Sequence, residues 1–355
     1  MKSKYIAWAI APIFLIGCSD YLETPPSVDY GENGVFATRA DAEKLLTTLY
    51  AEGMPYGFCM SSTNTDRRLL SSSTLASACD EGEDVATWAM GNAAWNAGNH
   101  TNTNFPWDED CRFYLRNHTM RVANLILKRI HEVPFDEGDP DFNKRTTGEA
   151  YFMRAMLLWE GVYRYGGMPI VRDVIDPTDF SQRPRNSFSD CIDSILIDCD
   201  RATQYLPDYY TDNAKLGRAT RIAALALKAR VLLYAASPLF NTSTPYMSFP
   251  GHEDLIGYGN YDRERWKKAA DAAKAAIDAA LASGHYKIHN TGNPDKDYED
   301  VWTIPDNEEI ILGNMKYRNF KTTSRPLVAN LPTWAMNKAW GDAGLYVTFN
   351  FVQHY

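Results

Sequence analysis

The sequence lacks the short motifs that mark common enzyme and metal centres. It contains no HExxH zinc motif, no GxSxG nucleophile turn and no phosphate-binding P-loop. It also lacks an excess of positive charge, because 36 Lys and Arg residues stand against 45 Asp and Glu. A protein that binds nucleic acid needs a basic face for the phosphates. These absences argue against the corresponding hydrolases and against nucleic acid as a partner.

Cysteine is scarce as well, with six residues and no CxxC spacing. Cys191 and Cys199 fall on one predicted helix, about 12 Å apart at 1.5 Å per residue. That separation is too long for a disulfide, so we expect two buried thiols. For Cys59 and Cys79, a disulfide between the two is an alternative to free thiols.

Long hydrophobic runs are missing, and the apolar run Tyr5–Ile16 is too short to span a bilayer. Lys2 and Lys4 precede it, as in a secretory signal. The run leads into Leu-Ile-Gly-Cys18, which resembles a bacterial lipobox and implies cleavage before a lipidated Cys18. The alternative is an ordinary secretory signal with a chance cysteine. Several acyl chains would anchor the protein stably, and loss of the two lysines would change the net charge from −9 to −11, with 34 basic against 45 acidic residues.

The stretch Thr147–Asp173 predicts an apolar-striped helix with an abrupt end. Apolar residues recur every three or four positions. Gly166 and Gly167 suit a helix C-terminus, and Pro169 prevents its continuation.

A similar stretch follows 69 residues later, and the preceding helices correspond too. The coinciding pairs are Ala150 with Ala219, Ala155 with Ala224, Leu158 with Leu227, Tyr165 with Tyr234, and Pro169 with Pro238. The predicted helix Trp266–Ala280 matches the pattern of residues 188–202 after a 78-residue step. This pattern indicates a helix hairpin with loops longer than those of a 34-residue tetratricopeptide repeat. The alternative is that two apolar helices align by chance.

Other helices are predicted from caps and periodicity. Thr38 and Ser187 each resemble the first residue of a capping box. The expected helices run from Thr38 to about Gly53, and over Asp108–Val133, Phe188–Leu206, Arg218–Tyr234 and Trp266–Leu281; short strands such as Glu309–Met315 follow. Trp159 and Trp266 lie on helix stripes and are expected in the core.

Residues 56–107 lack helical periodicity but carry Trp88, Trp95, Phe105 and Trp107. A long irregular segment in a compact protein is usually functional or disordered, and this aromatic density argues against disorder.

Several blocks together resemble the SusD/RagB family of outer-membrane nutrient-binding lipoproteins of Bacteroidota. The matching pieces are the lipobox with CSDYLETPP, RVANLIL, EAYFMRAMLLWEGVYRYGGMPIV, GRATRIAALALKARVLLYAASPLFN, WKKAADAAKAAID and DNEEIIL. They cover about residues 15 to 315 in family order. The resemblance implies a mainly α fold: a tetratricopeptide-like helical repeat scaffold with long loop insertions and a small irregular C-terminal part.

The resemblance also implies a place and a partner. Such proteins are displayed on the outer membrane at the cell surface, where they cap a SusC-like TonB-dependent transporter and capture oligosaccharides without a cofactor. Family members usually continue for over a hundred further residues, so we expect this sequence to be an N-terminal portion. The expected division is a signal peptide over 1–17, a lipidated tether over 18–37, a helical-repeat domain over 38–300 with the aromatic loop 56–107 inserted, and the start of an incomplete C-terminal subdomain over 301–355.

Glycan binding favours aromatic rings against the apolar faces of sugars, with polar side chains at the rim for the hydroxyl groups. The candidate glycan-binding residues are Asp80, Trp88, Trp95, Asn96, Asn99 and Trp302. The resemblance supports the location of this loop site but carries no residue-level motif. The alternative is that the tryptophans pack the loop against the helices, which we expect for Trp107.

Metal and catalytic signals are faint. Asp295–Glu299 begins like a calcium loop, but Asp300 replaces its glycine and Asp306 its bidentate glutamate, so a solvated acidic turn is expected. His285 and His289 follow Gly284 and need not share a helix face. No carboxylate pair stands out for glycoside hydrolysis. We therefore expect a non-enzymatic glycan-binding lipoprotein, with an envelope-assembly scaffold or a surface glycosidase as alternatives.

Overall fold

The computed structural model describes residues 32–54, 82–84, 98–99, 101, 112–176, 178–179, 181–304, 306–313 and 345–347. Within these residues the regular structure is helical, apart from two short strands. The longer helices are α2 (Arg39–Gly53), α5 (Arg112–Arg129), α6 (Phe142–Tyr165), α7 (Phe188–Tyr205), α8 (Arg221–Ala236), α9 (Arg263–Ala282) and α10 (Pro294–Thr303). The short elements are α1 (Glu32–Val35), β1 (Gly82–Asp84), β2 (Leu345–Val347) and the 3-10 turns η4 (Ile130–Glu132), η5 (Asn213–Lys215) and η6 (Glu253–Leu255).

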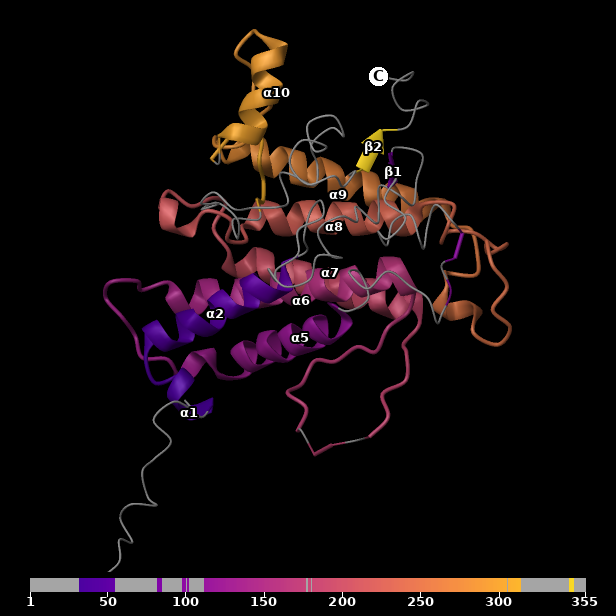
Figure 1. The fold of residues 1–355 in the computed structure, drawn as a ribbon, viewed down its shortest axis with the longest axis horizontal. Coiled ribbons are helices and arrows are strands. Elements are labelled where there is room, and N and C mark those ends of the chain that lie inside the picture. Colours follow the sequence, from indigo (N-terminus) through magenta and orange to yellow (C-terminus); the bar gives the residue numbers. More distant parts are fainter. Residues whose placement is uncertain are drawn as a thin grey trace, which may run out of the picture.

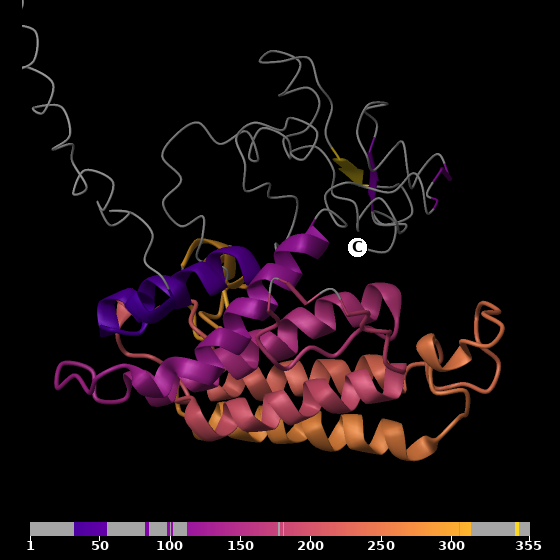
Figure 2. The ribbon, with the colours of Figure 1, turned by 90° about the horizontal axis from the view of Figure 1, so that it is seen from below.

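The helices from α2 to α9 form an array in which each element packs on the next one along the chain. The stack passes from indigo α2 through magenta α6 to orange α9 (Figures 1 and 2). Helix α10 projects away from this array in Figure 1. The mainly α, helical-repeat fold predicted from the sequence is confirmed.

Burial agrees with the 69-residue repeat. Ala150 and Ala219 are both fully buried, and so are Ala155 and Ala224. Ala150 and Ala155 lie on α6 and Ala224 on α8, whereas Ala219 directly precedes Thr220, the N-cap residue of α8. A larger residue at any of these buried positions would disturb the close packing. The repeated alanines therefore belong to the packing geometry of the array.

Two predicted helix caps are confirmed. The Thr38 hydroxyl accepts a hydrogen bond from the backbone N–H of Asp41 at 3.2 Å and donates one to its carboxylate at 2.7 Å. The Ser187 hydroxyl accepts one from the N–H of Asp190 at 3.0 Å. Each cap satisfies a donor that the first helical turn leaves without a partner.

The core consists of two apolar clusters that run along α6. The first joins α2 and α5 to the N-terminal half of α6, and the second joins α7 and α8 to its C-terminal half. Trp159 is buried in the second cluster, as predicted. The prediction for Trp266 was wrong, because its side chain is 38% exposed on the outer side of α9. The apolar stripe of α9 does not by itself show which face of the helix packs on α8. The face that is buried carries Ala269 and Ala276.

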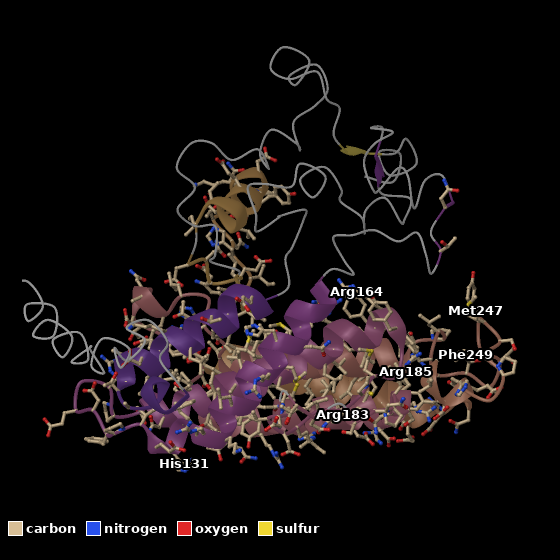
Figure 3. All side chains as sticks on the ribbon, turned by 60° about the horizontal axis from the view of Figure 1, so that its bottom comes forward. His131, Arg164, Arg183, Arg185, Met247 and Phe249 are labelled. Atoms are coloured by element: carbon tan, nitrogen blue, oxygen red, sulfur yellow. The ribbon has the colours of Figure 1, made fainter. Side chains whose placement is uncertain are left out.

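The Gly-Gly exit of α6 is a close contact between distant segments. Gly166 has φ of 76°, and the Gly167 N–H donates to the Leu255 carbonyl of η6 at 2.7 Å. The η6 segment belongs to the 242–261 loop between α8 and α9. Its Met247 and Phe249 project beyond the end of the array (Figure 3), and these residues are 73% and 38% exposed.

Three local predictions need correction. The extended tether was expected to reach residue 37, but α1 is helical and Phe36 is buried in the first cluster. The acidic turn at residues 295–299 is instead part of α10, where Asn293 caps the helix and Pro294 occupies its first turn. Residues 309–313, expected to begin a strand, follow a turn at Asn307 and contain no strand.

The two cysteines predicted as buried thiols are confirmed, since Cys191 and Cys199 are free and fully buried. Burial raises the pKa of both thiols, so neither is disposed to react as a thiolate. Cys18, Cys59, Cys79 and Trp107 lie outside the described residues. Within the described part of the chain, no helix combines the length and hydropathy needed to cross a bilayer.

Candidate binding site

Most of the predicted glycan-binding residues lie outside the described part of the chain, namely Asp80, Trp88, Trp95 and Asn96. Asn99 is described and is exposed, and Trp302 is in the last turn of α10. The inserted loop contributes β1, which pairs antiparallel with β2, with Glu83 opposite Tyr346. The loop and a segment near residue 346 therefore meet, and the grouping of the six residues stays a prediction.

Helix α10 is held by a histidine between two carboxylates. His289 Nε2 lies 3.0 Å from Asp300 Oδ2, and His289 Nδ1 lies 3.2 Å from Glu308 Oε1. The hydrogen bond with Asp300, followed by that with Glu308, raises the pKa of His289. The hydrogen bond with Lys296, followed by that with His289, lowers the pKa of Asp300, and the hydrogen bond with His289 lowers the pKa of Glu308. We call His289, Asp300 and Glu308 the His289 clamp; in the described residues no cluster of His, Cys, Asp or Glu is suited to hold a metal ion.

The His289 clamp should make the local stability of residues 285–309 depend on pH. A raised pKa in the folded state means that the contribution of His289 is complete below about 6.5 and is lost as the pH rises through the folded value. The protection of these residues against hydrogen exchange, relative to the intrinsic rate at each pH, should therefore fall between pH 6 and pH 8.5. His289→Gln should remove this dependence, whereas His131→Gln, at an exposed histidine of η4, should leave it unchanged. Equal exchange protection of the wild-type segment at both pH values would contradict the prediction.

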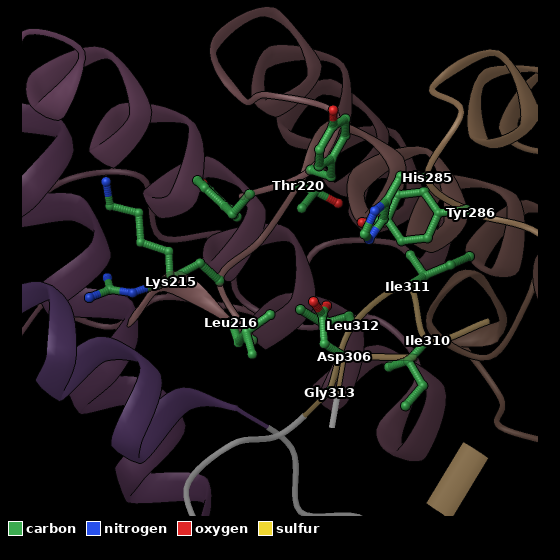
Figure 4. A pocket seen from close by; sticks show the side chains of 14 residues that line it. Lys215, Leu216, Thr220, His285, Tyr286, Asp306, Ile310, Ile311, Leu312 and Gly313 are labelled. Atoms are coloured by element: carbon green, nitrogen blue, oxygen red, sulfur yellow. The ribbon is translucent and has the colours of Figure 1, made fainter. Parts of the chain in front are cut away.

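A hollow lies between the α7–α8 connection and the segments on either side of α10 (Figure 4). The hollow is shallow: the space that it encloses is about 40 Å³, and its empty volume with the open mouth is about 430 Å³. Its lining is formed by Tyr209, Tyr210, Lys215, Leu216, Gly217, Arg218, Thr220, His285, Tyr286, Asp306, Ile310, Ile311, Leu312 and Gly313. We call it the Tyr209 pocket.

One wall of the Tyr209 pocket is aromatic. The Tyr209 and His285 rings are stacked with centroids 4.7 Å apart and planes within 3°. Tyr286 meets His285 edge-on at 4.8 Å. Tyr286 is buried, which raises its pKa, whereas Tyr209 is 38% exposed. The pair therefore presents a fixed ring surface that solvent can reach.

The cations of the pocket already have acidic partners. Lys215 Nζ lies 3.7 Å from the Asp139 carboxylate. The Arg218 guanidinium lies 3.3 Å from the carboxylate of Glu149 and 3.7 Å from that of Glu43. Burial raises the pKa of Glu149, and Arg218 opposes that shift. These pairs fix the segment 215–220 against α6 and α2, so the pocket has a rigid floor.

Sequence reasoning missed the Tyr209 pocket. His285 was noticed only for its spacing from His289, and Tyr209 carries no motif. The one available signal was the cluster Tyr209-Tyr210 in a loop between two predicted repeat helices, because loops of such scaffolds carry ligand sites.

The array with its long inter-helix segments and lined hollow defines a helical-repeat binding scaffold. The sequence model of a SusD-like family, described as starch-binding associating with outer membrane, matches residues 20–233. Because this match covers more than half of the chain, the protein belongs to the SusD-like family. A comparison with curated proteins found no match.

Solved structures agree on the fold. A SusD-like protein from Bacteroides fragilis is similar with a TM-score of 0.62 and 24% identity, over 88% of this chain and 51% of its own. A laminarin-binding SusD-like protein is similar with a TM-score of 0.56 and 20% identity, over 78% of this chain and 51% of its own. A SusD-like carbohydrate-binding protein from Bacteroides vulgatus has a TM-score of 0.53 and 17% identity, over 78% of this chain and 51% of its own. The chain thus spans about half the length of these structures.

Proposed function

We propose that this protein is a cell-surface lipoprotein that captures oligosaccharides and passes them to a SusC-like TonB-dependent transporter in the outer membrane. The observation that carries the proposal is the family match over residues 20–233, which includes nearly all of the helical array through α8. Cys18 is the proposed lipid attachment site. The protein binds its ligand without chemical conversion.

The proposed glycan site is the inserted loop with Trp88 and Trp95 as ring platforms. Asp80, Asn96 and Asn99 supply polar groups for sugar hydroxyls, and Trp302 joins from α10. Indole rings suit the apolar face of a pyranose, and amide or carboxylate groups at the rim fix its orientation. Two described parts of the segment support the proposal: Asn99 is exposed, and β1 pairs with β2.

Incubation of the purified protein with a panel of polysaccharides separates this proposal from its alternatives. Retarded migration in polysaccharide gels without release of products supports capture. Release of shorter sugars would indicate a glycosidase instead. Neither retardation nor release would favour an assembly scaffold that binds no sugar.

The loop site gives a direct mutational prediction. Replacement of both Trp88 and Trp95 by Ala should abolish retardation, because the sugar loses both stacking surfaces, each worth about 0.5–1.5 kcal/mol beyond the buried area. Trp266→Ala is the matched control, since it removes an exposed indole from α9. It should leave retardation unchanged. Unchanged retardation in the double variant, with a wild-type melting temperature, would refute the placement of the site.

A further inference from the structure

We propose that the Tyr209 pocket is a second carbohydrate subsite, which takes one neutral sugar residue of a bound oligosaccharide. The inference rests on the proposed function and deepens it, because it adds a sugar contact built from the helical scaffold to the predicted loop site. Its residues come from the α7–α8 connection and from the segments that flank α10. Three properties of the pocket carry the assignment: a ring platform, a charge balance and a rigid frame.

The platform is the stacked pair of Tyr209 and His285. Stacking with planes within 3° holds the Tyr209 ring flat against the imidazole, and 38% of Tyr209 remains exposed. Because Tyr286 packs edge-on against His285, the imidazole is fixed in turn. A flat ring that is partly exposed and held in one orientation binds a sugar face at low entropic cost.

The charge balance favours a neutral ligand over an anionic one. Lys215 and Arg218 belong to a wider ion-pair cluster in which four cations meet five carboxyl groups. The cations are Lys215, Arg218, Arg39 and Arg145, and the carboxyl groups are those of Glu43, Asp136, Asp139, Glu149 and Asp212. Asp306 adds an exposed carboxylate on the wall opposite Thr220 (Figure 4). An anion would meet this carboxylate without a free cation to compensate. A sugar hydroxyl, by contrast, can donate a hydrogen bond to it.

The frame of the pocket is held in place without a ligand. Tyr210 donates its hydroxyl to the Ala219 carbonyl at 3.0 Å, and the Ala219 N–H donates to the Tyr50 hydroxyl at 2.8 Å. On the other side, the Lys287 N–H donates to the Glu308 carbonyl at 3.1 Å, next to the His289 clamp. The wall formed by the α7–α8 connection is therefore tied to α2, and the two segments that flank α10 are tied to each other.

The pocket is also continuous in sequence with the predicted glycan site. Asp306 follows Trp302 by four residues, and α10 ends between them. An oligosaccharide that contacts Trp302 and continues into the Tyr209 pocket would meet two separate ring surfaces. Longer chains should then bind more tightly than short ones, because the second contact becomes intramolecular.

Titration calorimetry with linear starch-derived and laminarin-derived oligosaccharides of increasing length tests the assignment. For whichever series binds the wild type, Tyr209→Ala should weaken the affinity about fivefold to tenfold, the loss expected for one stacked ring. Asp306→Asn should weaken it by a smaller factor. The matched controls are Tyr246→Ala and Asp254→Asn, which alter exposed residues of the 242–261 loop and should leave the affinity unchanged.

Two further measurements locate the ligand and exclude unfolding. The imidazole proton resonances of His285 should shift on addition of the oligosaccharide, and His252 should not respond. Tyr209→Phe keeps the ring and should retain wild-type affinity, and a wild-type melting temperature of Tyr209→Ala would show that its loss of affinity is not a loss of the fold. Acidic oligogalacturonides should bind the pocket less well than the neutral series; preferential binding of the acidic series would overturn the charge argument.

The outcomes separate the two proposals. If the wild type binds no oligosaccharide of either series, the proposed function fails and the pocket assignment fails with it. If the wild type binds and the Trp88 and Trp95 variant does not, but Tyr209→Ala and the His285 resonances are unaffected, the loop site stands and the second subsite is wrong.

Discussion

Replacing Arg154 by Met is expected to lower the free energy of unfolding by about 3–5 kcal/mol, the cost of breaking a buried ion pair on one side. Arg154 is 5% exposed within the array. Its guanidinium makes two hydrogen bonds of 2.7 Å to the Asp198 carboxylate of α7, and a third of 3.0 Å to Asn124 of α5. One side chain of α6 thus ties together three helices of the array.

The loss is large because Asp198 would stay buried without its main partner. Asp198 is only 2% exposed, so water cannot replace the guanidinium. Arg172 lies 3.4 Å from the same carboxylate, and this second cation places the expected loss nearer 3 than 5 kcal/mol. Methionine keeps most of the volume of the side chain, so the effect measures the charge rather than a cavity.

Urea denaturation followed by circular dichroism measures the effect. Lys274→Met is the control, because Lys274 of α9 pairs with Asp278 across the exposed surface, and its loss should cost no more than about 0.5 kcal/mol. Adding Asp198→Leu to Arg154→Met should recover part of the stability by removing the stranded charge. A loss below 1 kcal/mol in Arg154→Met would mean that the ion pair contributes little to the array.

The helices that the sequence predicts best are those whose signals are local. Ser187 caps α7 three residues before Asp190, and most apolar positions of α7 turn toward the core, with Ile197 as an exposed exception. Caps and periodicity act within one or two turns of a helix, so a single sequence contains them. The repeat could be found for the same reason, since small residues recur at the helix contacts.

Other features depend on contacts between distant segments and could not be predicted in this way. Trp266 lies on an apolar stripe, but the stripe does not reveal that α8 covers the opposite side of α9. The Tyr209 pocket joins residues that are more than 70 positions apart in the sequence. Helix α10 was missed despite its Asn293 cap and Pro294, because its acidic residues resemble a calcium loop.

The candidate glycan residues were chosen by residue type and by position in a family resemblance. The family and the fold are now established, but neither identifies the side chains that contact a sugar. Asn99 and Trp302 belong to described segments; their roles stay predictions, like those of Trp88 and Trp95. Aromatic rings serve packing and ligand contact equally well, so only binding measurements distinguish these roles.

Gly166→Ala is expected to lower the free energy of unfolding by about 3 kcal/mol or more, through two separate causes. Gly166 has φ of 76° and ψ of −144° at the end of α6, a region that side chains other than glycine enter at a cost of about 1–3 kcal/mol. A Cβ atom there would also lie 2.1 Å from the Leu255 carbonyl oxygen. Because that atom belongs to the backbone, η6 would have to move away from α6.

A second glycine separates the two causes. Gly284 follows α9 with φ of 73°, and a Cβ atom on it would meet nothing within 4 Å. Gly284→Ala should therefore cost only the backbone term, about 1–2 kcal/mol. Urea denaturation of both variants gives the difference, which measures the contact between the α6 exit and η6. If the two variants lose equal stability, the Leu255 contact is adaptable, and the Gly-Gly exit serves only to stop the helix rather than to hold the 242–261 loop against the array.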